Sequence, residues 1–338
     1  MLVMLHRMFV WEQTESLSFA GEINYQQMKA IILNDFGGVE QLQPAELPAP
    51  GIKEGDVLVQ VKAISINPVD VKTREGKGMA ERLKDDKPMV LGWDISGVVM
   101  KSTSPLFTEG DDVFGMIRFP GSGRAYAEQV SAPAEQLALK PENVSHEEAA
   151  AATLAPLTAW QAFSDYGRLR PGQRILIHAA AGGVGHYAVQ IARHIGAYVI
   201  ATSSAENKDF VLSLGANEHI DYKAQRFEEV AKDIDFVLDT VGAENADRSL
   251  SVLKKGGTLI TTAGLSDATK EKAKARGIFA LGMFVQSAGE DMQHIAQLLE
   301  EGEMRSEIMK VFPLAQVADA HLQVETGRTR GKVVVVIK

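Results

Sequence analysis

The chain has 338 residues, a formal net charge of −9 and no cysteine. Its length exceeds the size at which a single hydrophobic core keeps growing, so we expect two domains. The negative charge argues against nucleic acid or an anionic membrane as the main partner. Because cysteine is absent, disulfides, thiolate nucleophiles and cysteine-built zinc sites are excluded.

The first 27 residues differ from the rest of the chain. The apolar stretch from Met1 to Val10 is interrupted by His6 and Arg7, and a polar stretch continues to Gln27. A secretory signal would carry positive charge first and a longer unbroken apolar core. We therefore expect residues 1–27 to be a poorly ordered extension and the protein to be cytoplasmic.

Short strands separated by turns are predicted from Met28 to about Ala150. The candidate strands are residues 28–33, 57–63, 95–99, 112–116 and 127–130. Since no long helix interrupts them, we expect a β-rich, barrel-like domain. The alanine-rich segment 145–167 is predicted to be helical and to lead into a second unit.

Strands and helices alternate from Arg174 onward. One strand is predicted to begin at Arg174 and to run into a loop of small residues, and others are predicted at 198–201, 219–221, 236–239, 257–261 and 278–285. Helices are predicted after the first strand and at 206–214. This alternation favours an α/β fold of the Rossmann type, a doubly wound parallel sheet with helices on both faces. The tail, residues 309–312 and 333–337, reverts to strands and is expected to rejoin the first domain.

A loop of small residues joins the first of these strands to its helix. Residues 180–185 read Ala-Ala-Gly-Gly-Val-Gly, with Ala180 in the first glycine position of G-x-G-x-x-G. Small side chains let the amides of Ala181, Gly182, Gly183 and Val184 approach a pyrophosphate, which the helix N-terminus also attracts. The alternative is a tight strand–helix turn that binds no ligand.

The end of the second strand indicates which dinucleotide binds. NAD sites place an acidic residue there, about 20 residues past the glycine turn, whereas this chain has Ser203 and Ser204. Their hydroxyls leave room for a 2′-phosphate, while Lys208 adds positive charge and Tyr222 a phenol. We therefore predict NADPH rather than NADH. The alternative is that the serines cap the next helix, which carries Glu206.

Further candidate cofactor residues follow the ends of the later strands, on the edge where dinucleotides bind. They are Thr240, Val241, Gly264, Leu265, Met283 and Phe284. The alternative is ordinary loop and core packing or, for Phe284, a subunit contact. His178 and His186 flank the phosphate loop and are assigned no role.

An ordered set of motifs resembles the zinc-free medium-chain dehydrogenase/reductases of the quinone oxidoreductase-like branch. The matching segments between Met28 and Lys338 include residues 65–70, 92–99, 157–160, 180–185, 213–216, 239–242 and 331–334. The resemblance implies a GroES-like domain at 28–152 and 287–338, and a Rossmann NADPH-binding domain at 153–286. It also implies a cofactor cleft between these domains and a homodimer.

Two departures from the zinc-dependent members bear on the chemistry. Asn67 and Trp93 stand where those members place a cysteine and a histidine ligand, and the histidines show no metal-ligand spacing. We therefore predict that no metal is bound. This disfavours alcohol oxidation, which needs a metal or a base to remove a proton. Reduction of a quinone or enone needs only hydrogen bonds to the developing oxyanion.

Asn67 is predicted to donate an amide hydrogen bond into the cleft, with a turn role as the alternative. The resemblance implies that Thr158 lies against the nicotinamide. It also implies that Lys332 approaches the cofactor, although a surface lysine is the alternative. Asp94 is expected to be a buried carboxylate paired with a basic side chain, and Tyr126 to be a packing residue.

The leading functional prediction is a metal-independent, NADPH-dependent oxidoreductase that transfers hydride to quinones or α,β-unsaturated carbonyls. An enoyl-thioester reductase is one alternative, and it would need a positioned proton donor. A low-turnover NADPH-binding protein with a redox-sensing or structural role is the other, because a fold does not fix a function. The expected partner is a small molecule rather than nucleic acid or a membrane.

Overall fold

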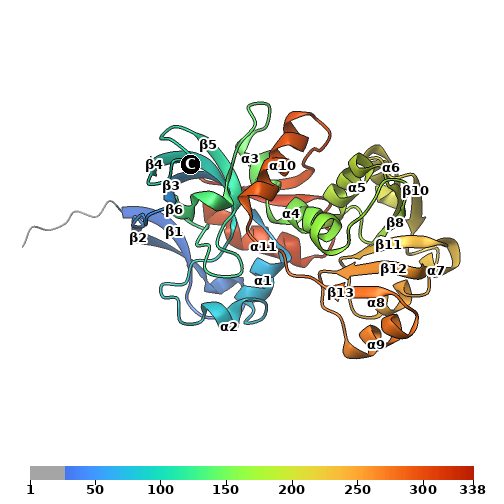
Figure 1. Cartoon of the computed structure of the whole chain (residues 1–338). Coiled ribbons are helices and arrows are strands. Elements are labelled where there is room, and N and C mark those ends of the chain that lie inside the picture. The colour runs from blue at the N-terminus through green and yellow to red at the C-terminus, as the bar shows by residue number, and fades with distance from the viewer. Residues whose placement is uncertain (1–26) are drawn as a thin grey trace, which may run out of the picture.

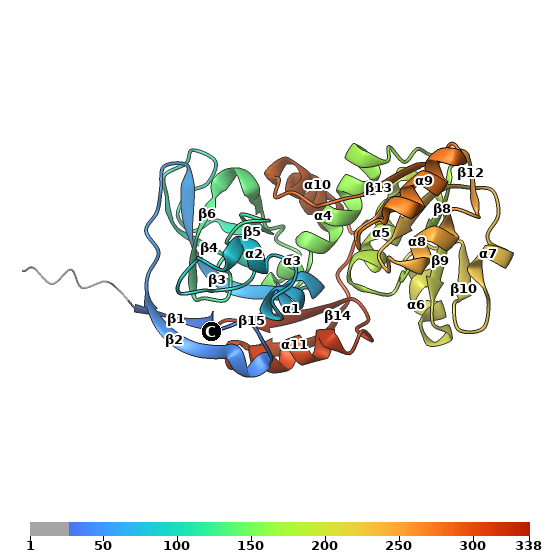
Figure 2. The same cartoon turned by 90° about the horizontal axis from the view of Figure 1, so that it is seen from below.

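The computed structural model describes residues 27–338. Residues 1–26, nearly all of the predicted extension, lie outside the described residues. Two large sheets occupy opposite ends of the molecule, and the helices α4 (Leu154–Gln161) and α10 (Gly289–Glu300) lie between them (Figures 1 and 2). Each half of the molecule is thus built around its own large sheet.

The sheet of the amino-terminal half is mixed. In order across the sheet its strands are β14 (Ile308–Pro313), β15 (Lys332–Val336), β3 (Asp56–Ile66), β4 (Asp94–Ser102), β5 (Asp112–Met116) and β7 (Ala138–Leu139), with β6 (Gln129–Pro133) paired to β3. All pairs are antiparallel except β14 with β15. Alternate residues of β3 face the core, and Val57, Val59 and Val61 are fully buried.

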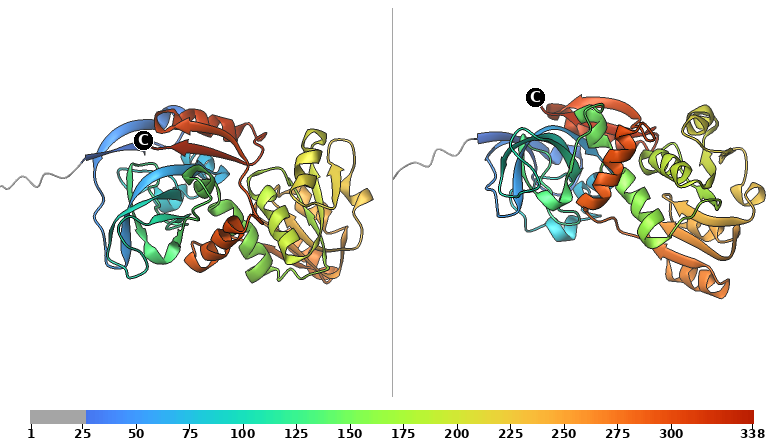
Figure 3. Two further views of the ribbon diagram at one scale, coloured as in Figure 1. Left: turned by 90° about the horizontal axis from the view of Figure 1, so that it is seen from above. Right: turned by 45° about the horizontal axis from the view of Figure 1, so that its top comes forward.

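The carboxyl-terminal tail completes this sheet. Val334 pairs with Ser65 and Val333 with Ile66, so β15 runs antiparallel to β3. Figure 3 shows this tail, in red, lying against the amino-terminal half of the chain. The predicted return of the tail is therefore confirmed. The sequence did not predict α10, which precedes the tail, or α11 (Val317–Glu325), which lies between its two strands.

The first strand of the fold belongs to a separate two-stranded sheet. β1 (Gln27–Leu33) pairs antiparallel with β2 (Leu42–Pro48), which was not predicted because its prolines were taken as loop markers. Three helices accompany the strands of this half: α1 (Pro68–Arg74), α2 (Ala80–Leu83) and α3 (His146–Ala151).

The second sheet is parallel throughout. Its order is β10 (Glu218–Asp221), β9 (Tyr198–Ser203), β8 (Arg174–Ile177), β11 (Ile234–Asp239), β12 (Leu253–Thr261) and β13 (Phe279–Gly282). The associated helices are α5 (Gly183–Ile195), α6 (Lys208–Ser213), α7 (Phe227–Val230), α8 (Glu244–Ser249) and α9 (Asp267–Ala275). This order confirms the predicted doubly wound fold. From β8 the chain adds β9 and β10 on one side, and from β11 it adds β12 and β13 on the other. Dinucleotides bind at this switch point in such sheets.

The predicted helical segment 145–167 is interrupted. α3 ends at Ala151, α4 begins at Leu154, and a π-helical turn (Ala162–Tyr166) follows α4. Thr153 between α3 and α4 has φ −118° and ψ −97°, which is not helical. The domain boundaries predicted at 152/153 and 286/287 stay predictions.

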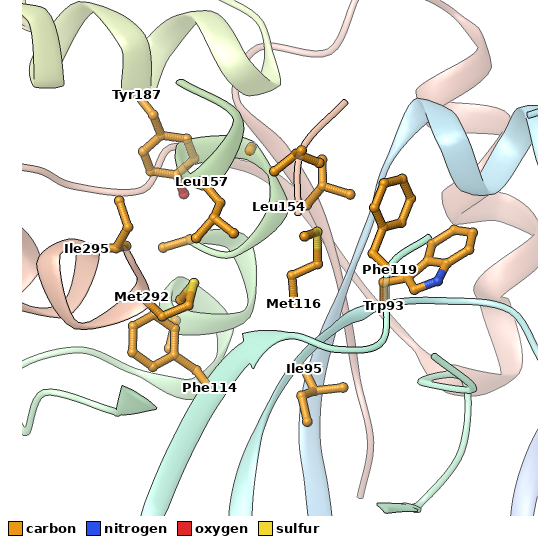
Figure 4. Close-up of a cluster of buried hydrophobic side chains, with 14 of the residues drawn as sticks. Trp93, Ile95, Phe114, Met116, Phe119, Leu154, Leu157, Tyr187, Met292 and Ile295 are labelled. Atoms are coloured by element: carbon orange, nitrogen blue, oxygen red, sulfur yellow. The ribbon is translucent and has the colours of Figure 1, made fainter. Parts of the chain in front are cut away.

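An apolar cluster fills the space between the sheet of the amino-terminal half and the connecting helices. Figure 4 shows Phe114 and Met116 of β5 facing Leu157 of α4 and Met292 and Ile295 of α10. All five side chains are fully buried. Met292 and Ile295 are three residues apart and therefore lie on one face of α10.

Candidate active site and cofactor site

The small-residue loop lies at the carboxyl end of β8 and leads into α5. Gly182 is the N-cap of α5 and has extended backbone angles, φ −82° and ψ −175°, with no side-chain cap. The first amides of a helix have no partner within the helix, so they are available to an anion. Thus, the loop has the form of an anion site.

The two glycines inside α5 serve different purposes. A β-carbon on Gly185 would lie 2.2 Å from the Ala179 carbonyl oxygen and 2.6 Å from Ala180 Cα, so glycine is required for α5 to approach β8. A β-carbon on Gly183 would meet Lys332 Cδ at 3.5 Å, an ordinary contact. Since packing does not demand glycine at 183, its small size serves to leave the helix N-terminus uncovered.

The residues predicted after the later strands share the carboxyl edge of the sheet. Asp239, at the end of β11, accepts hydrogen bonds from the backbone amides of Val241 (3.1 Å) and Gly242 (3.0 Å), which fixes the turn containing Thr240. The turns after β12 and β13 are adjacent, because a β-carbon on Gly282 would lie 3.5 Å from the Leu265 nitrogen.

The remaining residues of this edge differ in exposure. Gly264 and Val241 are exposed, whereas Met283 is buried and its amide donates to the Thr261 carbonyl at 2.8 Å. Phe284 is 50% exposed. The structure therefore brings all six predicted strand-end residues to one edge, and their contacts with the cofactor stay predictions.

Ser203 and Ser204 lie at the end of β9, as predicted, and both are buried. The Ser204 hydroxyl donates to Glu206 Oε1 at 2.9 Å and accepts from Asn207 Nδ2 at 3.1 Å. It makes no side-chain cap to the backbone of the helical turn that follows, so the alternative role as a cap is not observed. Tyr222 is exposed, and its amide donates to the Ser203 carbonyl at 3.3 Å.

A buried polar cluster lies where the tail meets the end of β3. The Asp94 carboxylate is its centre, because Oδ2 accepts from Ser65 Oγ at 2.6 Å and from Asn67 Nδ2 at 2.7 Å. Its Oδ1 accepts from the Leu154 amide at the start of α4, at 3.2 Å. Lys332 Nζ lies 3.8 Å from Asp94 Oδ2. Asp94 is thus the buried, paired carboxylate expected from the sequence.

Both ends of the Asn67 amide are engaged within this cluster. Its nitrogen donates to Asp94, and its Oδ1 accepts a hydrogen bond from Lys332 Nζ. Asn67 is 2% exposed. Direct donation into the cleft stays a prediction, whereas the geometry shows an amide that positions Lys332 against Asp94.

Lys332 connects the phosphate loop to this cluster. The preceding Gly331 amide donates to the Ala181 carbonyl at 2.9 Å, so β15 begins directly against the loop. Lys332 is 3% exposed, which excludes the alternative of a surface lysine. Burial lowers the pKa of Lys332, while the carboxyl groups of Asp94 and Asp70 act in the opposite direction.

A second layer of buried ionisable groups lies behind Asn67. Asp70 Oδ2 accepts from the Asn67 amide at 2.7 Å. Burial, with the charge of Asp94 second, raises the pKa of Asp70 to about 7. The Tyr126 hydroxyl pairs with His321 Nε2 at 2.9 Å, and burial raises the Tyr126 pKa well above its ordinary value. These contacts agree with the packing role expected for Tyr126.

Thr158 lies on α4, one turn after Leu154. Its hydroxyl donates to the Leu154 carbonyl at 2.7 Å, and the residue is 4% exposed. Because the Leu154 amide binds Asp94, Thr158 lies one helical turn from the polar cluster. Its contact with the nicotinamide stays a prediction.

An aromatic group stands where zinc-dependent relatives carry a histidine ligand. The Trp93 indole is 1% exposed and donates from Nε1 to the Gly121 carbonyl at 2.6 Å. Its ring meets the Phe119 ring edge-on at 5.3 Å, as Figure 4 shows. Phe119 in turn stacks on Phe284 at 5.6 Å with an interplanar angle of 14°. These rings join the loop after β5 to the segment after β13.

Ser65 belongs to the polar cluster but was not predicted from the sequence. It lies two residues before Asn67, at a spacing that places two side chains on the same side of an extended chain. That spacing was the available signal. The link through Leu154 could not be foreseen, because it depends on how α4 packs against β4.

Among residues 27–338, no group of three or more His, Cys, Asp or Glu side chains could hold a metal ion. Over the same residues, no helix is long and apolar enough to cross a membrane.

Comparison with known proteins places this geometry in a family. Residues 53–142 match the alcohol dehydrogenase GroES-like domain, and residues 214–335 match a model described as zinc-binding dehydrogenase. A 2-methylene-furan-3-one reductase of Solanum lycopersicum is 34% identical over 336 residues, covering 96% of this chain and 81% of that protein. The chain belongs to the medium-chain dehydrogenase/reductase family.

Other members are also similar over nearly the whole length. The NADPH-dependent alkenal/one oxidoreductase, chloroplastic, of Arabidopsis thaliana is 33% identical, covering 92% of this chain and 80% of that protein. The solved quinone oxidoreductase from Coxiella burnetii has a TM-score of 0.87 and 35% identity, covering 93% of this chain and all of that one. The resemblance to the quinone oxidoreductase-like branch is thereby confirmed.

Proposed function

We propose that this protein is an NADPH-dependent oxidoreductase that reduces quinones or α,β-unsaturated carbonyls without a metal ion. The observation that carries the proposal is the Lys332–Asn67–Asp94 group beside the phosphate loop. A buried ammonium held by a carboxylate and an amide is suited to stabilise negative charge on a substrate oxygen. The names of the family members that the chain resembles agree with this chemistry.

Different groups of residues bind the different parts of NADPH. Ala181, Gly182, Gly183 and Val184 present backbone amides to the pyrophosphate. A second group binds the 2′-phosphate and consists of Ser203, Ser204, Lys208 and Tyr222. The nicotinamide side is bounded by Thr158 and by the strand-end residues Thr240, Val241, Gly264, Leu265, Met283 and Phe284.

NADPH, when bound, supplies the hydride. Lys332 then faces the oxygen on which negative charge develops, and Asn67 and Asp94 fix the direction of its ammonium group. Because these groups are already oriented in a buried site, they need no reorganisation during the reaction. The proton that completes the reduction comes from water.

A substrate panel on one preparation tests the proposal. We expect NADPH oxidation with 9,10-phenanthrenequinone and with an aliphatic enone, unchanged by a chelator, and no stoichiometric metal. Loss of activity on chelation would contradict the metal-free mechanism. Tight NADPH binding without turnover would favour the redox-sensing or structural alternative.

The enoyl-thioester reductase alternative is tested in the same panel with a short enoyl-CoA. That reaction needs a positioned proton donor, and Tyr126 is fully buried with its hydroxyl on His321. We therefore expect slower turnover of the thioester than of the enone. The reverse order would favour the alternative.

A homodimer and a cytoplasmic location complete the proposal. The homodimer rests on the family resemblance, and its test is the mass of the purified protein in solution. The location is tested by cell fractionation, where recovery in an organelle would overturn it. The Arabidopsis relative is named chloroplastic, so members of the family differ in location.

A further inference from the structure

One titratable side chain beside the predicted 2′-phosphate site has no assigned role. His219 lies on β10, whose Asp221 pairs with Ser203 of the neighbouring β9. The His219 Nε2 and Ser203 Oγ atoms are 2.9 Å apart. Because alternate residues of a strand share a face, His219, Asp221 and Ser203 lie on the same face of the sheet.

The groups that shift the pKa of His219 come from three elements. Burial lowers its pKa, and the Lys208 ammonium on α6 acts in the same direction, whereas Asp221 on β10 opposes them. From β9, Ser203 contributes no charge, but its hydrogen bond raises the pKa of His219. The net effect is a pKa below the ordinary 6.5 in the protein without cofactor, so the neutral imidazole is the major form at pH 7.

A phosphate group would change this balance. A 2′-phosphate bound by the Ser203 hydroxyl would share that hydroxyl with His219. A phosphate monoester carries between one and two negative charges near neutral pH, because its second pKa is about 6. Negative charge at hydrogen-bond range favours the protonated form of an imidazole.

We propose that His219 is a charge-switching member of the 2′-phosphate site: binding of NADP(H) protonates its imidazole, which then pairs with the phosphate beside Ser203. This inference rests on the proposed NADPH preference and adds a mechanism for it. It makes discrimination between NADP(H) and NAD(H) depend on pH. It also makes cofactor binding take up a proton.

A neighbouring carboxylate acts against the same phosphate. Glu206 is exposed and accepts a hydrogen bond from Ser204 at 2.9 Å. Its negative charge disfavours a bound phosphate. A protonated His219 and Glu206 would thus have opposite effects on phosphate binding.

Calorimetric titration of the full chain with NADP+ and NAD+ tests the inference. These ligands differ only in the 2′-phosphate and are stable in mild acid. Measurements at pH 7 in two buffers of different ionisation enthalpy give the number of protons bound. We expect uptake of up to about one proton with NADP+ and none with NAD+. Where uptake is complete, NADP+ affinity falls about tenfold per pH unit.

The His219→Gln variant keeps a hydrogen-bonding side chain that cannot be protonated. We expect it to lose the proton uptake and to bind NADP+ about fivefold to tenfold more weakly at pH 6.5, with NAD+ affinity unchanged. Proton uptake that persists in His219→Gln would come from another group and would contradict the proposal. Its unfolding temperature without ligand shows whether the fold is retained.

Two further variants serve as controls. His194→Gln changes an exposed histidine in the last turn of α5, and it should behave as wild type. Glu206→Gln should strengthen NADP+ binding while keeping the proton uptake. If Glu206→Gln abolishes the uptake, Glu206 is the titrating group and the proposal for His219 is overturned.

Failure of this inference can be separated from failure of the proposed function. Tight and selective NADP+ binding with no proton uptake in the wild-type protein would overturn the role of His219 alone. NAD+ binding as tight as NADP+ binding would overturn the NADPH preference itself.

Discussion

At the scale of single residues, the polar cluster shows how a carboxylate is kept in the core. Asp94 is fully buried, yet it accepts hydrogen bonds from Ser65, Asn67 and the Leu154 amide. Such an ion persists only when its remaining lone pairs are bonded and a counter-charge is near. Lys332 supplies that charge at 3.8 Å.

Removing the cation alone should therefore be costly. Lys332→Met leaves the Asp94 carboxylate buried without its counter-charge, a change that costs about 3–5 kcal/mol in buried pairs. We expect a corresponding decrease in the free energy of unfolding, measured in urea, together with loss of NADPH oxidation.

The double variant Lys332→Met/Asp94→Asn separates the two effects. It removes both charges and should regain most of the stability while staying inactive. If Lys332→Met unfolds at the wild-type urea concentration, the pair does not stabilise the fold as argued.

The raised pKa of Asp70 makes the free energy of unfolding depend on pH. This pKa is raised from 3.8 to about 7, so between these values the folded state holds a proton that the unfolded state has released. The free energy of unfolding therefore falls as pH rises through this window. At 1.36 kcal/mol per pKa unit, the loss is about 4 kcal/mol.

Asp70→Asn should remove this dependence. We expect the variant to match wild type at pH 4.5 and to be the more stable protein at pH 8, measured by urea unfolding. The Asn oxygen can still accept from the Asn67 amide. Parallel stability curves for the two proteins across this range would contradict the raised pKa.

At the scale of elements, the β8–α5 junction contains one glycine that packing requires, Gly185, and one that packing does not require, Gly183. Gly185→Ala places a β-carbon 2.2 Å from the Ala179 carbonyl, and backbone cannot yield as a flexible side chain does. We expect destabilisation by about 3 kcal/mol. Gly183→Ala meets only ordinary contacts, so stability should stay within about 0.5 kcal/mol.

Cofactor affinity should depend on Gly183, although stability does not. Gly183→Ala covers the N-terminus of α5, and we expect NADP+ to bind at least about tenfold more weakly, a loss of about 1.4 kcal/mol. Calorimetry on the folded variant measures this. Unchanged affinity would show that the loop does not hold the pyrophosphate.

The elements that the sequence predicted are those with strong local patterns. β5 was predicted with its observed bounds, and a strand was predicted from Arg174, where β8 begins, since each is a short apolar run next to turn signals. β2 was missed because Pro44 and Pro48 weaken a strand signal that its pairing with β1 overrides. α10 and α11 were missed within a tail read only for its strands.

In the candidate site, too, local motifs were predicted from the sequence and long-range contacts were not. The phosphate loop and the serines of β9 were predicted because each depends on a local motif. The Lys332–Asn67 contact joins residues 265 positions apart, and no local pattern encodes it. Only the family resemblance indicated that Lys332 approaches the cofactor.

At the scale of the whole molecule, the two sheets are joined on both sides of the polar cluster. On one side, Gly331 bonds to the phosphate loop at Ala181. On the other, Phe119 stacks on Phe284, and the Phe119 amide donates to Ser287 Oγ at 3.1 Å. The aromatic contact therefore couples the loop after β5 to the cofactor-side edge of the parallel sheet.

Phe284→Ala should loosen this second connection. An aromatic pair contributes about 0.5–1.5 kcal/mol beyond the area it buries, so the overall fold should persist. We expect faster hydrogen exchange in residues 117–124 and a raised KM for quinones, because this loop loses the aromatic ring on which Phe119 stacks.

Phe279→Ala provides the matched control. Phe279 and Phe284 are 51% and 50% exposed, and both lie on or just after β13. Since Phe279 stacks on no aromatic ring among residues 27–338, its removal should leave the exchange of residues 117–124 unchanged. If both variants speed exchange equally, general loosening of β13, rather than the Phe119–Phe284 stack, controls the loop.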